Sequence, residues 1–65
     1  MIGSREVIRR LKDAGWEQAY VNGSHHYFIH PKQPERGKVT VKHPAKDYPI
    51  KTLRSMEKQS GVSLR

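Results

Sequence analysis

The dipeptide Asn22-Gly23 constrains the fold of this chain more than any other feature of its sequence. It separates two short runs of aromatic and β-branched residues, 16–21 and 25–30. Asn-Gly between two such runs is the strongest short-range signal for a β-hairpin, because both residues accept positive φ angles. We therefore predict two antiparallel strands over 16–21 and 25–30, with Pro31 ending the second.

A third strand is predicted over 38–43, after a loop rich in proline and glycine. Its residues alternate with a period of two, which places Val39 and Val41 on one face. The opposite face then carries Lys38, Thr40 and Lys42. This strand should be half buried and half basic.

The inward face of the first two strands is left open by the sequence. In the second strand, Tyr27 and Ile29 compete with Phe28 for the buried side, and the first strand shows a similar ambiguity. Trp16 is expected in the core, because large apolar residues are few. Tyr20 and Tyr27 are candidates for stacking on nucleobases.

Apolar residues at helical spacing predict one helix on each side of the three strands. The first covers 5–14, with Ser4 as its N-cap and Gly15 as its stop, and the second covers 50–60, ended by Gly61. Each helix has a single apolar stripe. We therefore predict an α+β fold of order α-β-β-β-α, in which two helices cover one face of a three-stranded antiparallel sheet.

Sixty-five residues suffice for one small domain, expected to span 1–65. The formal net charge is +7, and a field of this sign concentrates polyanions, of which nucleic acid is the commonest in a cytosol. The chain has no cysteine, which excludes disulfides and thiolate chemistry. Because no apolar run exceeds three residues, we expect a cytoplasmic protein with no leader and no membrane span.

Basic residues are concentrated in the second half of the chain. Residues 37–65 have a net charge of +5, against +2 for residues 1–36. The third strand and the second helix are therefore the better candidates for contacting phosphates, although a solvated helix face would explain the second helix equally well. The candidate RNA-binding residues are Ser24, Lys38, Lys42, Lys46, Lys51 and Arg54.

The segment Gly23-Ser24-His25-His26 contains the candidate catalytic group. The ordinary pKa of histidine, about 6.5, lets it exchange protons near neutrality. His25 lies beside the predicted hairpin turn, where backbone N–H groups and basic surroundings attract phosphate. We expect it to act as a general base on an RNA 2′-hydroxyl, the alternative being a polar strand residue. No metal or cofactor is expected, because His25 and His26 point to opposite faces of a strand and few carboxylates lie near them.

Four segments occur at the spacing typical of one known family: Gly15-Trp16, GSHHYFIHP over 23–31, VTVKHP over 39–44 and LRSMEKQSG over 53–61. On these segments the chain resembles the HicA family of type II toxins. The resemblance implies a fold similar to a double-stranded RNA-binding domain. It also implies an endoribonuclease that cleaves mRNA without a metal through one essential histidine, and a hetero-oligomer with an inhibitory HicB antitoxin.

Carried over by position, the catalytic histidine of the family is His25, the residue after Gly-Ser. His26 is its rival, because some members place another residue directly after Gly-Ser. The chain departs from the family at Asn22, where a basic residue is usual, and at Lys42, where proline is usual. The alternative function is a non-catalytic RNA-binding module of the double-stranded RNA-binding type, which needs the basic face but not the histidine.

Overall fold

A computed structural model describes residues 2–64 of the chain. The elements in chain order are α1 (Ser4–Asp13), β1 (Glu17–Asn22), β2 (His25–Ile29), the short 3-10 helix η1 (Pro34–Arg36), β3 (Val39–Lys42) and α2 (Ile50–Ser60). The predicted α-β-β-β-α order is confirmed. The bounds of α2 are those predicted; α1, β1 and β3 differ from prediction by one residue at each end, and β2 ends one residue earlier than predicted.

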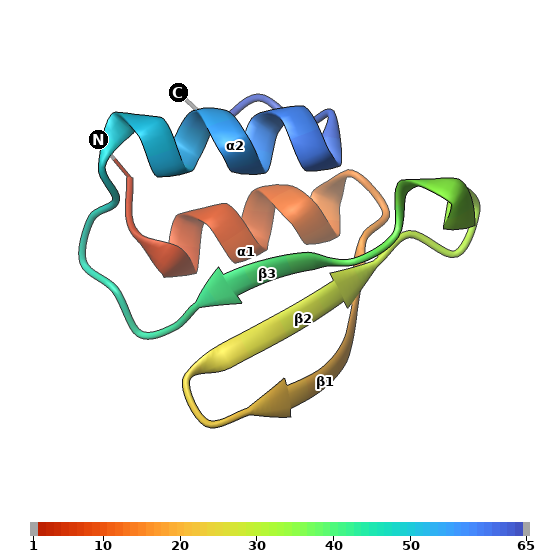
Figure 1. The fold of residues 1–65 in the computed structure, drawn as a ribbon, viewed down its shortest axis with the longest axis horizontal. Helices are drawn as coiled ribbons and strands as arrows, with labels where there is room; N and C mark the ends of the chain where they lie inside the picture. The colour runs from red at the N-terminus through yellow and green to blue at the C-terminus, as the bar shows by residue number, and fades with distance from the viewer. Residues whose placement is uncertain (1, 65) are drawn as a thin grey trace.

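The three strands form one antiparallel sheet in the order β1-β2-β3. Both helices lie on the same side of this sheet, as Figure 1 shows, and pack against β3. Val39 and Val41 are fully buried beneath them, whereas Thr40 and Lys42 are exposed on the other side. We call the side without helices the open face.

The core lies between the sheet and the two helices. Phe28 is the buried residue of β2, which settles the inward face that the sequence left open. Trp16 is 2% exposed, so its prediction as a core residue is confirmed. The buried apolar side chains are Val7, Leu11, Trp16, Phe28, Val39, Val41, Tyr48, Leu53, Met56 and Leu64.

The ends of both helices follow from glycines that adopt positive φ angles. At the end of α1, the N–H of Gly15 donates to the carbonyl of Lys12, and the N–H of Trp16 donates to that of Leu11. This pair of bonds is the Schellman motif, and Gly15 has the φ of +97° that it favours. Gly61 ends α2 in the same left-handed region, at +72°. Both predicted stops are confirmed.

The start of α1 differs from the prediction. Gly3 is the N-cap, and Ser4 is the first helical residue, with no capping bond from its side chain. A Cβ at Gly3 would lie 2.4 Å from the carbonyl oxygen of Lys46, so glycine lets segment 43–46 approach the helix closely. The prediction of Ser4 as N-cap is therefore wrong, because its hydroxyl binds that segment instead.

The predicted hairpin is confirmed, but its turn is shifted by one residue. Asn22 pairs with His25, so the two-residue loop is Gly23-Ser24 and not Asn22-Gly23. Gly23 has a φ of +62°, and Ser24 does not have a positive φ. This combination is typical of a type II′ turn, which takes glycine at its first position. His25 consequently follows the turn directly.

β1 is an exposed edge of the sheet. All six of its residues are exposed, and its register with β2 shifts between Gln18 and Tyr20, which leaves Ala19 as a bulge. A bulge of this kind twists an edge strand and interrupts its pairing. Figure 1 shows β1 as the strand farthest from the two helices.

Candidate functional site

His25 lies on the open face, at the end of the sheet where the hairpin turns. It is the first residue of β2 and pairs in register with Asn22 on one side and Lys42 on the other. Directly opposed residues of an antiparallel pair share a face, with Cβ atoms about 5 Å apart. His25 is exposed, and its ring has no hydrogen-bond partner among residues 2–64. Its nitrogens are therefore free to contact a ligand beside a lysine.

His26 occupies the opposite side of β2 and is half-buried. Its ring meets the His43 ring edge to face, with 5.0 Å between the centroids. Its Nδ1 lies 3.5 Å from Oε1 of Gln18, a distance at the weak limit of a hydrogen bond. The two candidate histidines thus have different surroundings: the ring of His25 is free, and that of His26 is packed against its neighbours.

Aromatic and basic side chains continue the open face away from His25. Tyr20 and Tyr27 pair across β1 and β2 with stacked rings, and Thr40 opposes Tyr27 from β3. Lys38 Nζ donates a hydrogen bond of 2.9 Å to Tyr20 Oη. This bond raises the pKa of Lys38 above its ordinary value, which keeps the ammonium group charged.

The candidate RNA-binding residues lie in three different parts of the surface. Lys38 and Lys42 share the open face with His25, and Ser24 lies in the turn beside it. Lys51 and Arg54 are exposed on α2, whose buried residues pack toward the sheet, so they belong to the layer opposite the open face. Lys46 is exposed near the start of α1. One continuous face joining β3, α2 and the histidine is not formed.

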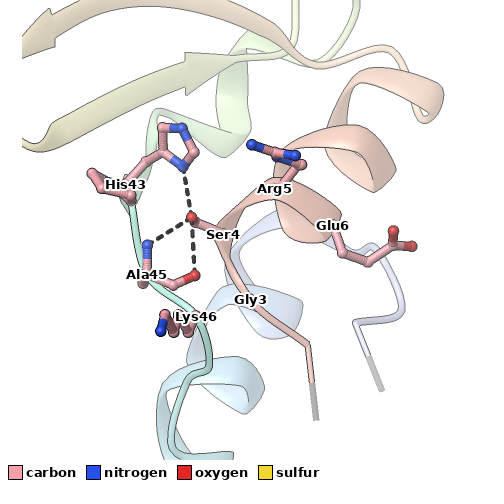
Figure 2. A pocket seen from close by; sticks show the side chains of 8 residues that line it. Gly3, Ser4, Arg5, Glu6, His43, Ala45 and Lys46 are labelled. Carbon is pink, nitrogen blue, oxygen red and sulfur yellow. Dashed lines mark hydrogen bonds between the residues drawn. The ribbon is translucent and has the colours of Figure 1, made fainter.

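A hydrogen-bonded clamp joins the start of α1 to the end of β3, as Figure 2 shows. The hydroxyl of Ser4 lies 2.6 Å from His43 Nδ1, accepts a bond of 2.9 Å from the Ala45 N–H and lies 3.2 Å from the Ala45 carbonyl. Ser4 is 2% exposed. Because it is buried, its hydroxyl can hold this segment in place but cannot meet a large substrate.

The same clamp reaches the hairpin turn. The backbone N–H of His43 donates to the Ser24 carbonyl at 2.8 Å, directly before His25. Tyr48 is buried and donates its hydroxyl proton to the Lys42 carbonyl. Burial raises the pKa of Tyr48 above its ordinary value, so this donor stays protonated. Ser4, His43 and Tyr48 together fix the position of the backbone that holds His25 and Lys42.

Sequence reasoning missed this supporting role of Ser4, His43 and Tyr48. For Tyr48 a signal was present: it precedes the N-cap residue Pro49, and Leu53 stands four residues into the helix. Apolar residues at these two positions commonly pack together as a hydrophobic staple, and both belong to the core. The contact between Ser4 and His43 has no local signal, because 39 residues separate them.

An open cavity of about 630 Å³ adjoins the clamp. His43 and Ser4 line it together with Arg5, Lys46 and the backbone of Gly3 (Figure 2). Glu6 lines it as well, so the cavity carries both basic and acidic side chains, and His25 does not line it. Within residues 2–64, no three histidine or acidic side chains converge as the ligands of a metal ion would.

The sequence profile of a family described as the HicA toxin of bacterial toxin-antitoxin systems matches residues 4–62. The chain belongs to the HicA toxin family. It is thus a toxin of a toxin-antitoxin system, as its motifs predicted, and the matched segment includes both the hairpin turn and the clamp. No curated protein sequence matches the chain significantly. In the described part of this HicA toxin, neither helix is long and apolar enough to cross a bilayer.

The basic residues of α1 and those of the open face of this HicA toxin differ in whether acidic residues pair with them. On α1, Glu6 binds both Arg9 and Arg10, and Arg9 also binds Asp13. The hydrogen bonds from Arg9 and Arg10 lower the pKa of Glu6 to about 2. On the open face, neither Lys42 nor Lys38 has an ion pair with any residue from 2 to 64, and Lys38 donates a hydrogen bond to Tyr20. Positive charge is therefore partly neutralised on α1 and available beside His25.

Proposed function

We propose that this HicA toxin is an endoribonuclease that cleaves mRNA, with His25 as its acid-base group and no metal. The observation that carries this proposal is the position of His25, whose exposed and unpartnered ring lies opposite Lys42 on the open face. A catalytic base needs a nitrogen within reach of the substrate, and a developing phosphorane charge needs a nearby cation. His25 and Lys42 can supply these two functions side by side.

In the proposed reaction, a neutral His25 takes the proton of a 2′-hydroxyl, and the 2′-oxygen attacks the adjacent phosphorus. The bond from phosphorus to the 5′-oxygen breaks, and the leaving oxygen takes a proton from water at this exposed site. The products are a 2′,3′-cyclic phosphate and a 5′-hydroxyl end. Proton transfer of this kind contributes about 10²–10⁴-fold, so a site with one acid-base residue predicts modest turnover.

The clamp supports this proposal by fixing the catalytic segment. A general base contributes fully only where its nitrogen and the reacting hydroxyl are held in the productive geometry. Ser4 contacts His43 directly after β3, Tyr48 donates to the carbonyl of Lys42 at the end of β3, and the N–H of His43 donates to the carbonyl of Ser24. We therefore assign these three residues to positioning, and His25 to proton transfer.

The test is expression of the parent, His25→Ala and His26→Ala in growing cells. We expect the parent to arrest growth and degrade RNA, His25→Ala to do neither, and His26→Ala to remain active if it folds. Substrate carrying a 2′-deoxy nucleotide at the cleavage position should resist the purified parent. If both single variants stay as toxic as the parent, the assignment is wrong. RNA that is bound but left intact by the parent would favour the non-catalytic module instead.

We also propose that a HicB antitoxin inhibits the toxin by covering His25 and the basic part of the open face. An acidic surface of matching shape would block RNA by steric and electrostatic means. Replacing Lys42 by glutamate should therefore weaken the binding of both RNA and antitoxin. Unchanged affinity for both ligands would remove Lys42 from the two binding surfaces.

A further inference from the structure

Two tyrosines form a stacked pair on the open face. Tyr20 of β1 and Tyr27 of β2 are direct cross-strand partners. Their ring centroids are 4.5 Å apart and their planes differ by 20°, so the rings lie face against face. Tyr20 is 48% exposed. The pair thus presents an accessible aromatic surface whose geometry is already fixed.

A cation lies at one end of this pair. Lys38 Nζ is 5.5 Å from the ring centroid of Tyr20 and 4.9 Å from that of Tyr27, and it donates a hydrogen bond to Tyr20 Oη. Together these contacts hold both rings and the ammonium group in one arrangement. An aromatic surface beside a positive charge suits a ligand that combines a flat ring with a phosphate.

The pair has no part in the buried core. Core residues of β2 and β3, such as Phe28 and Val41, point to the helices, and both tyrosines point to the opposite side. On β2, Tyr27 follows His25 by two residues and shares its face. The rise of a strand places the two side chains about 7 Å apart along β2. The aromatic surface is therefore adjacent to the proposed catalytic histidine.

We propose that Tyr20 and Tyr27 form a stacking platform for an unpaired base of the RNA strand next to the phosphate at His25, which makes single-stranded RNA the substrate class. This inference rests on the proposed function for the identity of the ligand. A base within a duplex is covered on both faces by its neighbours, so it cannot stack on a side chain. Lys38 would then contact the next phosphate of the strand, on the side of the stacked base that faces away from His25.

The test measures binding with RNA that cannot be cleaved by attack of its 2′-hydroxyl. A 2′-fluoro RNA strand, alone and annealed to its complement, is titrated at one fixed salt concentration with the parent, Tyr20→Ala, Tyr20→Phe and Val21→Ala. Val21 is the matched control, because it is the next residue of β1, is 45% exposed and faces the other side. Circular dichroism checks that each variant is folded.

We expect the parent to bind the single strand at least about five-fold more tightly than the duplex. This is the difference in affinity expected when one base stacks on an aromatic side chain in the single strand but not in the duplex. Tyr20→Ala should lose this preference, whereas Tyr20→Phe, which keeps the ring, and Val21→Ala should retain it. Equal binding of single strand and duplex by the parent would overturn the inference. Parent-like affinity of Tyr20→Ala for the single strand would overturn it too.

This result is separable from the proposed function. Every variant in the titration keeps His25, and the RNA lacks the attacking hydroxyl. A parent that shows the preference but cleaves no natural RNA would refute the ribonuclease proposal and support the platform. A parent that cleaves RNA but shows no preference would refute the platform alone.

Discussion

Replacement of Ser4 by alanine removes the centre of the clamp between α1 and β3. Its hydroxyl accepts the Ala45 N–H at 2.9 Å and contacts His43 Nδ1 at 2.6 Å. Leaving a buried polar group without its partner costs about 1–3 kcal/mol, and alanine at the first helical turn offsets little of this. For a domain of this size, about 1 kcal/mol lowers the melting temperature by about 4–8 °C. The melting temperature of Ser4→Ala should therefore be at least about 4–8 °C below that of the parent.

The assay is thermal unfolding followed by circular dichroism, with urea unfolding as a second measure. Ser55→Ala is the matched control, because Ser55 is exposed on α2 and alanine there favours the helix. We expect Ser55→Ala to be neutral or slightly stabilising. If Ser4→Ala loses no more stability than this control, the hydroxyl does not hold the segment and the reasoning fails. If it is destabilised as expected, its RNA cleavage below the melting range should also fall, because the turn beside His25 is less firmly held.

Three further predictions concern other parts of the fold. Phe28 is fully buried, so Phe28→Ala should cost about 3–5 kcal/mol and leave circular dichroism spectra of a largely unfolded chain, whereas Ile29→Ala on the open face should stay folded. His30→Ala should lower the urea midpoint clearly, because its ring bonds the Ala14 carbonyl and the Lys32 N–H; an unchanged midpoint would contradict this. Because the pKa of Glu6 falls from 4.5 to about 2 on folding, its contribution to stability is complete above pH 4.5 and is lost as pH falls through 2. Urea midpoints between these pH values should fall less steeply for Glu6→Gln than for the parent, and equal slopes would refute the assignment.

The elements of the fold could be predicted from the sequence, because their signals are local. The glycine that follows each helix needs only its own φ freedom to stop it, and Gly15 and Gly61 were both correct stops. The alternation around Val39 and Val41 correctly predicted the two faces of β3. The hairpin was also correct, although its loop begins at Gly23, which is the loop residue with the positive φ that this turn requires.

The candidate site could be predicted only in part, because its geometry depends on packing between distant segments. Three consecutive apolar residues around Phe28 gave no alternation, so the sequence did not show which of His25 and His26 faces the helices. The burial of Phe28 and the pairing of His26 with the buried Val41 place His26 on the helix side. The partnership of Ser4 with His43 likewise exists only once α1 has packed against β3.

The placement of the basic residues depends on the layers of the fold. Lys42 and Lys51 are both exposed and basic, and the charge pattern of the sequence made both of them candidates for contacting phosphates. The structure puts Lys42 on the open face and Lys51 on a helix of the opposite layer. The charge pattern of the sequence therefore could not show that these basic residues lie on two different layers of the fold.

The most direct test of this account is the single-turnover cleavage rate of a labelled RNA by purified parent, His25→Ala and His26→Ala proteins of verified fold. We predict that His25→Ala cleaves at least about 100-fold more slowly than the parent, as expected for the loss of a general base. His26→Ala should retain most of the parent's rate. Cleavage by His25→Ala at the rate of the parent would contradict the central claim that His25 transfers the proton.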